Sequence, residues 1–252
     1  KYATSRIRKV KSDREDAALL AEIAERESRL PERFVPDIAW LSTQKKLNLV
    51  ASLDKQIQQL KAILKNYEET LQDLAVFENT HQELIKNSIK ELKTAKVRLE
   101  QDIEQAVKER LHNPEKKAVL TQLTSIPGVS SYVASLILHA FERVGKDSPK
   151  QWIAYLGLDI STRESGTWQG KCRLTKRGNP YLRKRLYSAA WGATMHDSEF
   201  KHYYERLKSE NNRKHIEALI IIARKLLRIM FSLIKHGQSY IPQTCFTQSS
   251  LS

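Results

Sequence analysis

The sequence predicts a mainly α-helical protein, and three observations lead to this prediction. Turn-forming residues are scarce, with 8 glycines and 7 prolines among 252 residues, which is about half of the roughly 12% usual in soluble proteins. A β-sandwich or barrel would need a turn about every ten residues. Apolar residues recur at helical spacing through most of the chain, and helix-start signals precede several of these runs. The patterns divide the chain into residues 1–37, 38–113, 114–240 and 241–252.

The first segment, residues 1–37, predicts one short helix after a basic lead. Ser12 and Glu15 stand three residues apart in the S-x-x-E form of a capping box, with Ser12 as the N-cap. Asp13 and Asp16 share one face of this helix because they too are three residues apart. Two carboxylates so placed can bind Mg²⁺, which takes oxygen ligands. From the residues alone, the favoured interpretation is that acids in a first turn suit the helix dipole.

The second segment, residues 38–113, predicts a coiled coil. Apolar residues from Val50 to Leu74 alternate at spacings of three and four residues, which is the heptad pattern of helices that pack along a seam. The pattern fails at Glu78 and His81 and then resumes loosely. Two interpretations remain, a single helix about 110 Å long at 1.5 Å per residue or an antiparallel hairpin that turns at this break. We favour the hairpin.

Residues 114–159 predict three helices. The first two flank a tight turn with Gly128 at its centre, which is similar to a helix-hairpin-helix and would place a backbone N–H near a DNA phosphate. The usual hairpin has a second glycine where Ser130 stands, and a plain helix–turn–helix corner is an equally weighted alternative. Ser148 and Pro149 supply an N-cap and a first-turn proline for the third helix.

The remaining residues predict a polar loop and three further helices. Asn179 and Pro180 again form an N-cap and a first-turn proline. We expect helices at residues 181–194, 199–209 and 213–236, and a frayed, polar tail after Gly237 that includes residues 241–252.

The charge balance predicts a nucleic-acid partner. The chain has 43 lysines and arginines against 29 acidic residues, a net charge of +14, and such a field suits a polyanion. The densest cationic run lies beside the capped helix at Asn179, and this position favours nucleic-acid binding over a merely solvated loop. The candidate nucleic-acid-binding residues are Arg163, Lys171, Arg173, Lys176, Arg177, Arg183, Lys184, Arg185 and, from the predicted hairpin, Gly128.

Several other classes of protein are disfavoured. No uncharged apolar run approaches the roughly 18 residues of a membrane span, so no membrane partner is expected. Two cysteines, Cys172 and Cys245, rule out a disulfide scaffold and a Cys-rich zinc site, and this usage is typical of a reducing cytoplasm. The first residue is Lys1 rather than methionine, so we expect the chain to begin inside a longer protein.

Ser165 is a candidate nucleophile that the residue pattern alone does not single out. A serine hydroxyl is a weak nucleophile unless a base or nearby cations activate it. Ser165 lies inside the cationic run, where arginines would favour its ionisation and stabilise charge on a pentavalent phosphorus. A lone serine is far more often a solvated polar residue.

Three groups of motifs occur in order along the chain. They are Lys11-Ser12-Asp13-Arg14-Glu15-Asp16-Ala17; then Ile126-Pro127-Gly128-Val129 with Trp152-Ile153-Ala154-Tyr155-Leu156-Gly157-Leu158; and then Glu164-Ser165-Gly166 with Leu174-Thr175-Lys176-Arg177-Gly178-Asn179, Leu182-Arg183 and Leu186-Tyr187. With a coiled coil between the first two, this order resembles one family of insertion-sequence transposases. These enzymes are guided by a bridge RNA and include the pilin-gene invertase Piv. The resemblance covers nearly the whole chain, and its last block is the most specific.

The resemblance implies a fold and a mechanism. It implies that residues 1–37 end a RuvC-like domain, with Asp13 and Asp16 as the last two acids of a Mg²⁺-binding DEDD set whose first Asp and Glu are absent from this chain. It further implies that residues 114–240 form a transposase domain in which Ser165 is the catalytic nucleophile and joins DNA through a serine–DNA phosphodiester. The implied partners are donor and target DNA, a guide RNA and further copies of the chain, as a dimer or tetramer through the coiled coil, in the bacterial cytoplasm.

Two alternative functions remain open from the sequence. A non-catalytic coiled-coil and helix-hairpin-helix module would hold branched nucleic acid without cutting it, and it explains the charge and the heptads. A junction resolvase would use metal bound by carboxylates alone. Both alternatives predict that Ser165 is dispensable, whereas only the resolvase predicts that loss of Asp16 is harmful.

Overall fold

The computed structural model describes residues 13–26, 37–73, 80–111, 114–142, 144, 148–161, 164–165, 168–169 and 173–246. The chain divides into two compact units, Lys1–Ile38 and Ala39–Ser252. The described residues are mainly α-helical, which confirms the predicted fold class. None of their helices has the length and apolar character needed to cross a membrane.

The first unit contains one helix, α1 (Asp13–Arg26). It begins at the residue after Ser12, as the capping box predicts. Ser12 itself lies outside the described residues, so its capping hydrogen bond stays a prediction.

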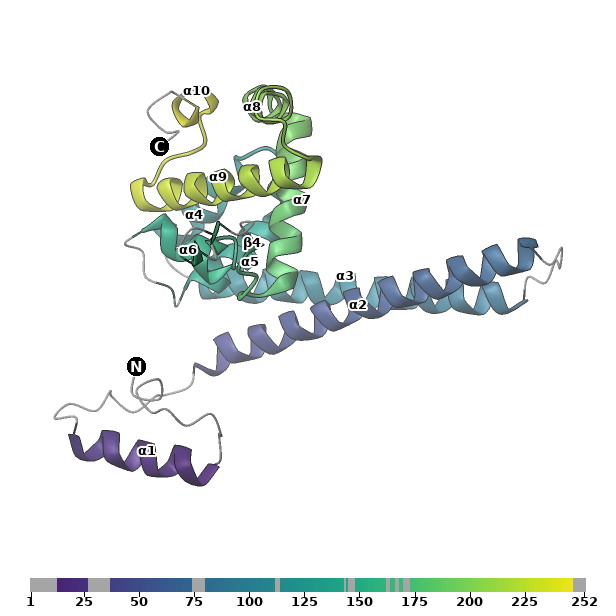
Figure 1. Cartoon of the computed structure of the whole chain (residues 1–252), viewed down its shortest axis with the longest axis horizontal. Helices are drawn as coiled ribbons and strands as arrows, with labels where there is room; N and C mark the ends of the chain where they lie inside the picture. The colour runs from purple at the N-terminus through teal and green to yellow at the C-terminus, as the bar shows by residue number, and fades with distance from the viewer. Residues whose placement is uncertain are drawn as a thin grey trace. The chain divides into compact units, whose positions relative to one another are not determined.

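The predicted coiled coil is an antiparallel hairpin of two helices, α2 (Ile38–Asp73) and α3 (Thr80–Arg110). The ion pairs between the two helices show that they are antiparallel. Lys46, early in α2, pairs with Asp102, late in α3, and Glu68, late in α2, pairs with Lys86, early in α3. The hairpin interpretation is therefore confirmed, and the interpretation as one continuous helix is wrong. We call this hairpin the arm; in Figure 1 it lies along one side of the other helices of the second unit and extends beyond them.

The seam of the arm follows the predicted heptads and has one polar interruption. Val50 and Ile57 are buried on α2, and Ile89 and Ile103 are buried on α3. Lys96 keeps the three-and-four spacing between Ile89 and Ile103, so a charged residue stands at an apolar position of the repeat. Its partners lie partly outside the arm and are described with the site below.

The other helices form a globular domain around one long apolar helix. They are α4 (Pro114–Thr124), α5 (Ser131–Phe141), α6 (Pro149–Tyr155), α7 (Pro180–His196), α8 (Ser198–Ser209), α9 (His215–His236) and α10 (Pro242–Cys245). Helix α9 packs against α4, α6, α7 and α8, and its central side chains, such as Leu219, Ile222 and Leu226, are fully buried. Burying large aliphatic side chains contributes roughly 1.5–3 kcal/mol each, so α9 is the centre of the core. The predicted bounds of α7, α8 and α9 hold to within about two residues.

Helix starts in this domain agree with the predicted caps. The Ser148 side chain accepts a hydrogen bond from the Lys150 N–H at the start of α6. The Asn179 side chain accepts from the N–H groups of Tyr181 and Leu182 at the start of α7. Each cap satisfies donors that the first helical turn leaves without partners.

The segment expected as a polar loop contains four short strands. Strand β1 (Ile160–Ser161) pairs antiparallel with β4 (Arg173–Leu174), and β2 (Glu164–Ser165) pairs antiparallel with β3 (Trp168–Gln169). The β2–β3 pair therefore lies between the two strands of the β1–β4 pair in the sequence. Two-residue strands carry too short an alternation for sequence reading to detect.

The tail differs from the prediction that it is frayed after Gly237. The Tyr240 hydroxyl donates to the Asp197 carboxylate at 3.1 Å, and the Tyr240 N–H donates to the Ser125 hydroxyl at 2.9 Å. The Phe246 ring meets Phe200 edge-on, with 4.9 Å between ring centroids. Residues 240–246 thus pack on the domain, because aromatic side chains offset the polar composition. Residues 247–252 lie outside the described residues.

Candidate nucleic-acid interface

The block Leu174–Asn179 is attached to the end of α6 by backbone hydrogen bonds. The Thr175 N–H donates to the Asp159 carbonyl at 3.1 Å, and the Lys176 N–H donates to the Gly157 carbonyl at 3.0 Å. The Thr175 hydroxyl also donates to the Asp159 carboxylate. The block is therefore a fixed element of the domain and presents its side chains in defined positions.

Arg183 reinforces this attachment. Its guanidinium Nη1 donates to the Leu156 carbonyl at 3.0 Å and to the Gly178 carbonyl at 2.6 Å. These bonds join the end of α6, the block and the first turn of α7. The sequence predicts Arg183 as a nucleic-acid contact, but the structure shows that its guanidinium holds the backbone of the block in place.

Two glycines allow the block to lie against α6. Gly157 has a positive φ of 64°, and a Cβ on it would lie 2.5 Å from the Arg177 nitrogen. A Cβ on Gly178 would lie 2.1 Å from the Tyr155 carbonyl oxygen. Side chains cannot approach backbone atoms this closely, so the packing requires glycine at both positions.

Ser165 lies on a different strand pair from the one at which this block begins. It is the second residue of β2 and pairs with Trp168 of β3. It stands four positions after Ser161, whose Cα partner in the β1–β4 pair is Arg173, so the Ser165 Cα lies within about 14 Å of the Ser161 Cα. The side chain of Ser165 is outside the described part of the structure, so its role as a nucleophile beside the cationic block stays a prediction.

The predicted cations differ in their availability. Lys176 and Arg177 are exposed, and Lys176 has the left-handed backbone conformation, with φ of 53°. Nothing is described of the side chains of Arg163, Lys171 and Arg173. Lys176 and Arg177 are therefore the cations of this block that the structure shows open to solvent.

Lys184 and Arg185, predicted as nucleic-acid contacts, form ion pairs within the protein. The Lys184 ammonium donates to the carboxylate of Asp54 on α2, which also accepts from Lys96 of α3. The Arg185 guanidinium donates to the carboxylate of Glu100 on α3. We call Asp54, Lys96, Glu100, Lys184 and Arg185 the arm clamp, because they join both helices of the arm to the cationic start of α7.

Two tyrosines complete the arm clamp. The Tyr181 hydroxyl donates to Glu100 at 2.9 Å and accepts from the Arg185 Nε at 2.8 Å. The Tyr132 hydroxyl lies 3.2 Å from that of Tyr181. Burial raises the pKa of Tyr181 to about 12, so the phenol remains protonated and able to donate at neutral pH.

The charge state of Asp54 depends on the arm clamp. Asp54 is only 8% exposed. Burial by itself would raise the pKa of its carboxyl, but hydrogen bonds from Lys184 and Lys96 and the charges of both outweigh burial and hold the pKa below its ordinary value. Asp54 is therefore ionised at neutral pH and binds both ammonium groups.

We expect the Asp54→Asn substitution to destabilise the protein at pH 7 by about 1–3 kcal/mol, because it removes an ionised, largely buried acceptor from two ammonium donors, of which Lys96 is largely buried and Lys184 is half exposed. The folded-state pKa of Asp54 lies below the unfolded one, so its stabilisation is full only well above the unfolded pKa of about 3.9 and is lost as the pH falls through the folded value. The difference between wild type and variant should therefore shrink in acid. Urea unfolding at several pH values measures it.

Asp102→Asn is the matched control for this substitution. Asp102 also lies on the arm, but its carboxylate is 59% exposed and its partner, the Lys46 ammonium, is 4.0 Å away. Exposed pairs contribute little, so Asp102→Asn should leave the unfolding free energy almost unchanged. Equal effects of the two substitutions would contradict the importance assigned to Asp54.

Gly128 has a packing role that the sequence does not reveal. Its φ is +83°, and a Cβ on it would lie 2.3 Å from the Ala193 nitrogen and 2.8 Å from the Ala189 carbonyl oxygen. Gly128 therefore brings the α4–α5 turn directly onto the backbone of α7. Ser130, at the position expected for a second hairpin glycine, is the N-cap of α5 and accepts from the Val133 N–H at 3.3 Å.

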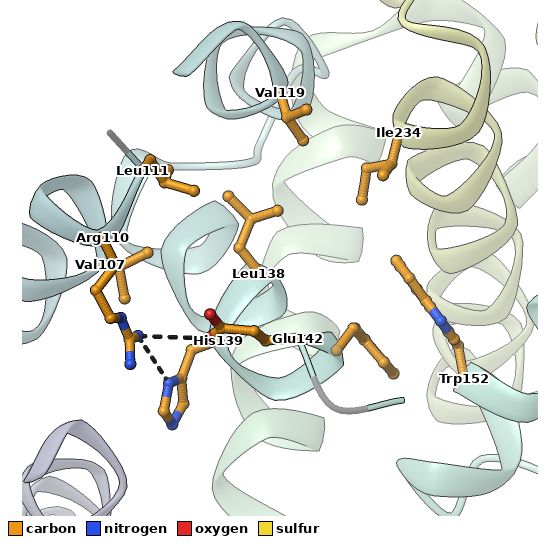
Figure 2. Close-up of a pocket in the computed structure, with 10 residues that line it drawn as sticks. Val107, Arg110, Leu111, Val119, Leu138, His139, Glu142, Trp152 and Ile234 are labelled. Atoms are coloured by element: carbon orange, nitrogen blue, oxygen red, sulfur yellow. Dashed lines mark hydrogen bonds and ion pairs between the residues drawn. The ribbon is translucent and has the colours of Figure 1, made fainter. Parts of the chain in front are cut away.

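A cavity of about 240 Å³ lies on another part of the domain, between α3, α4, α5, α6 and α9. Its walls are mainly apolar, and Figure 2 shows the Arg110 guanidinium directed at the His139 ring and the Glu142 carboxylate. The Arg110 Nη2 lies 3.0 Å from the His139 Nδ1 and 3.8 Å from Glu142. No predicted site residue lines this cavity.

The predicted magnesium ligands are placed on α1, one turn apart. Both Asp13 and Asp16 belong to this helix, but their side chains are not described. Within the described residues no group of three or more His, Cys, Asp or Glu side chains is arranged to bind a metal. Because Mg²⁺ takes six oxygen ligands in near-octahedral geometry, these two carboxylates supply at most part of such a site.

The described residues of the second unit form a helical domain joined to an antiparallel arm, and comparison with known proteins finds a family that part of this domain resembles. Residues 120–205 match the model of the Transposase IS116/IS110/IS902 family. Residues 120–205 are thus similar to the transposase domain of this family, which agrees with the resemblance found in the sequence motifs. The matched segment includes Gly128, Ser165 and the 174–179 block.

Two insertion-element proteins are similar to this chain. The "Insertion element IS110 uncharacterized 43.6 kDa protein" of Streptomyces coelicolor is 26% identical over 119 residues, or 47% of this chain and 29% of that protein. The "Insertion element IS900 uncharacterized 42 kDa protein" of Mycobacterium paratuberculosis is 27% identical over 88 residues, or 35% of this chain and 22% of that protein. The similarity to this chain thus spans less than a third of either relative.

Proposed function

We propose that this chain is part of a DNA transposase that cuts and rejoins strands through a covalent serine–DNA intermediate. The observation that carries the proposal is the family match over residues 120–205, which contains Ser165 and the block held on α6. The exposed side chains of Lys176 and Arg177 support it, because cations near a reacting phosphodiester bind and neutralise its negative charge.

The proposed reaction is two successive phosphoryl transfers. The Ser165 Oγ attacks the phosphorus of a DNA phosphodiester, the Oγ–P bond forms, and the bond to the leaving sugar oxygen breaks. The serine proton leaves, and the departing sugar oxygen gains a proton. A sugar hydroxyl of another strand then attacks the same phosphorus, which releases Ser165. Each step exchanges one phosphate ester for another, so the joining needs no ATP.

The proposal includes partners that the family resemblance implies. Donor and target DNA would be the substrates, a guide RNA would select them, and further copies of the chain would assemble through the arm. Asp13 and Asp16 would hold Mg²⁺ together with ligands from outside the described residues. A bound Mg²⁺ ion acts as a Lewis acid that polarises a phosphoryl oxygen.

The test of the proposed function is to isolate the covalent intermediate. Full-length transposase, its guide RNA and end-labelled DNA would be incubated, denatured and digested with protease and nuclease. Mass spectrometry should find a nucleotide on the peptide that contains Ser165. A complex that recombines DNA without any protein–DNA adduct would contradict the serine mechanism and favour the carboxylate–metal resolvase. Binding with neither adduct nor cleavage would favour the non-catalytic module.

We expect Lys176→Ala and Arg177→Ala each to lower the affinity for DNA. We also expect the affinity of each variant to fall less steeply with salt concentration than that of the wild type. Each phosphate contact that is lost reduces the slope of log K against log [salt] by about 0.9. The measurement is a titration of fluorescent duplex DNA at several salt concentrations. Lys65→Ala removes an exposed cation from the arm, where it pairs with Glu69 at 3.5 Å, and should leave the slope unchanged. A slope unaffected by either block variant would place the phosphate contacts elsewhere.

A further inference from the structure

A group of solvent-accessible aromatic rings lies where α7, α8 and α9 meet. Trp191 of α7 is 41% exposed. Its ring centroid lies 6.2 Å from that of Tyr204 on α8 and 5.2 Å from that of His215 at the start of α9. Both contacts are near-perpendicular, at 76° and 83°, so neither ring stacks on a face of Trp191. We call Trp191, Tyr204 and His215 the aromatic platform.

The platform stands on a rigid base. The opposite side of α7 is buried through Ala189, Ala190 and Ala193, so the helix cannot rotate Trp191 inward. The Tyr204 hydroxyl lies 2.7 Å from the His215 Nδ1, and this hydrogen bond fixes the two supporting rings relative to each other. The three rings therefore keep their arrangement without a ligand, which lowers the entropy lost on binding.

The surface around the platform is apolar and cationic. Met195, one turn after Trp191, is 60% exposed. The Lys208 ammonium lies 5.7 Å from the centroid of the Tyr204 ring. The Arg213 N–H donates to the Leu207 carbonyl at 3.1 Å, which places the exposed residues Arg213 and Lys214 beside the end of α8 that carries Lys208.

We propose that the aromatic platform stacks an unpaired nucleobase of single-stranded nucleic acid, with Lys208 and Arg213 contacting the adjoining phosphates. The inference rests on the proposed function, because it adds a subsite to a nucleic-acid-processing domain. Rigid exposed rings beside cations are the combination with which proteins bind single strands, since every base has a π-face and every nucleotide a phosphate. The cations complement the phosphates, and this complementarity favours a nucleic acid over an apolar protein partner.

The platform lies apart in sequence from the proposed strand-transfer residues. Trp191 is on α7, whereas Ser165 is on β2 and the 174–179 block precedes α7. A base held at the platform would therefore belong to a strand segment that the reaction leaves unpaired, or to the guide RNA. Both sources offer the same stacking chemistry, and oligonucleotides of each kind distinguish them.

The test compares Trp191→Ala with the conservative Trp191→Phe in the full chain. Binding to fluorescent dT12, rU12 and a 12-base-pair duplex would be measured by anisotropy, with circular dichroism as a check of folding. Trp191→Ala should weaken single-strand binding about tenfold and leave duplex binding within twofold. Trp191→Phe should restore most of the loss, because phenylalanine also stacks. Lower affinity for rU12 than for dT12 would point to DNA as the source, and the reverse to RNA.

Tyr155→Ala is the matched control, because Tyr155 is an equally exposed aromatic residue, at 45%, on α6. It should change neither affinity. Unchanged single-strand binding by Trp191→Ala, or an equal loss for duplex and single strand, would overturn the platform while leaving the proposed function intact. A wild-type chain that binds none of the three oligonucleotides would overturn both. A change of oligomeric state in Trp191→Ala, with single-strand affinity unaltered, would assign the surface to protein contact instead.

Discussion

Replacing Ser165 by alanine is expected to abolish the covalent protein–DNA adduct and to reduce strand joining by a factor on the order of 10⁴ or more, because the reaction loses its nucleophile. The substitution removes one hydroxyl from a residue of β2 whose strand pairing with Trp168 is made by backbone atoms. DNA binding and folding should therefore be preserved. Denaturing gels with end-labelled DNA measure the adduct, and amplification across the junction measures joining.

Two comparisons sharpen this prediction. Ser188→Ala removes a hydroxyl from α7 that donates only to the Lys184 carbonyl of its own helix at 3.1 Å, and it should leave joining unchanged. Ser165→Cys keeps a nucleophilic atom and should retain a trace of adduct. Full joining activity by Ser165→Ala in an assembled complex would rule out the serine intermediate.

The substitution expected to destabilise the fold most is Gly128→Ala, by about 2–5 kcal/mol. A left-handed backbone costs a residue with a Cβ roughly 1–2 kcal/mol. The new Cβ would also meet the Ala193 nitrogen at 2.3 Å, and relieving such overpacking costs typically another 1–3 kcal/mol. The turn would have to move away from α7, or α7 from the turn. Urea unfolding followed by circular dichroism measures the loss.

Gly237→Ala separates the two contributions to this loss. Gly237 also has a left-handed backbone, with φ of 66°, but the nearest atom to a Cβ there is the Gln122 Nε2 at 4.0 Å. It should therefore lose only the backbone contribution of about 1–2 kcal/mol. If both variants lose the same amount, the close approach between Gly128 and α7 contributes nothing to stability.

Local signals in the sequence predict the helices well. Ser148 and Asn179 are followed by proline, and both make the capping hydrogen bonds expected of them. The heptad break at Glu78 and His81 predicts the turn of the arm a few residues late, since α2 ends at Asp73 and α3 begins at Thr80, before His81. Such signals act within one turn or one repeat, so a single sequence is sufficient to read them.

Interactions between distant segments are what the sequence could not reveal. Lys184 and Arg185 look like free cations because their partners, Asp54 and Glu100, lie about a hundred residues earlier. Arg183 and Gly128 likewise have packing roles that depend on backbone atoms of other elements. Asp54 and Lys96 gave one overlooked signal, because charged residues at or beside the apolar seam of a coiled coil commonly have specific partners.

The position of the arm clamp also has a mechanical consequence, because a long part of α2 extends beyond Asp54. From Asp54 to the end of α2 at Asp73, the helix rises about 28 Å. A tilt of about 10° at the clamp therefore displaces the tip by about 5 Å, roughly one helical turn. A phosphate that bound Lys184 in place of Asp54, or Arg185 in place of Glu100, would act at the clamp, far from the end of α2 at Asp73. An exchange of ionic partners beside α7 that tilted the arm by this amount would therefore move the far end of α2 by about one helical turn.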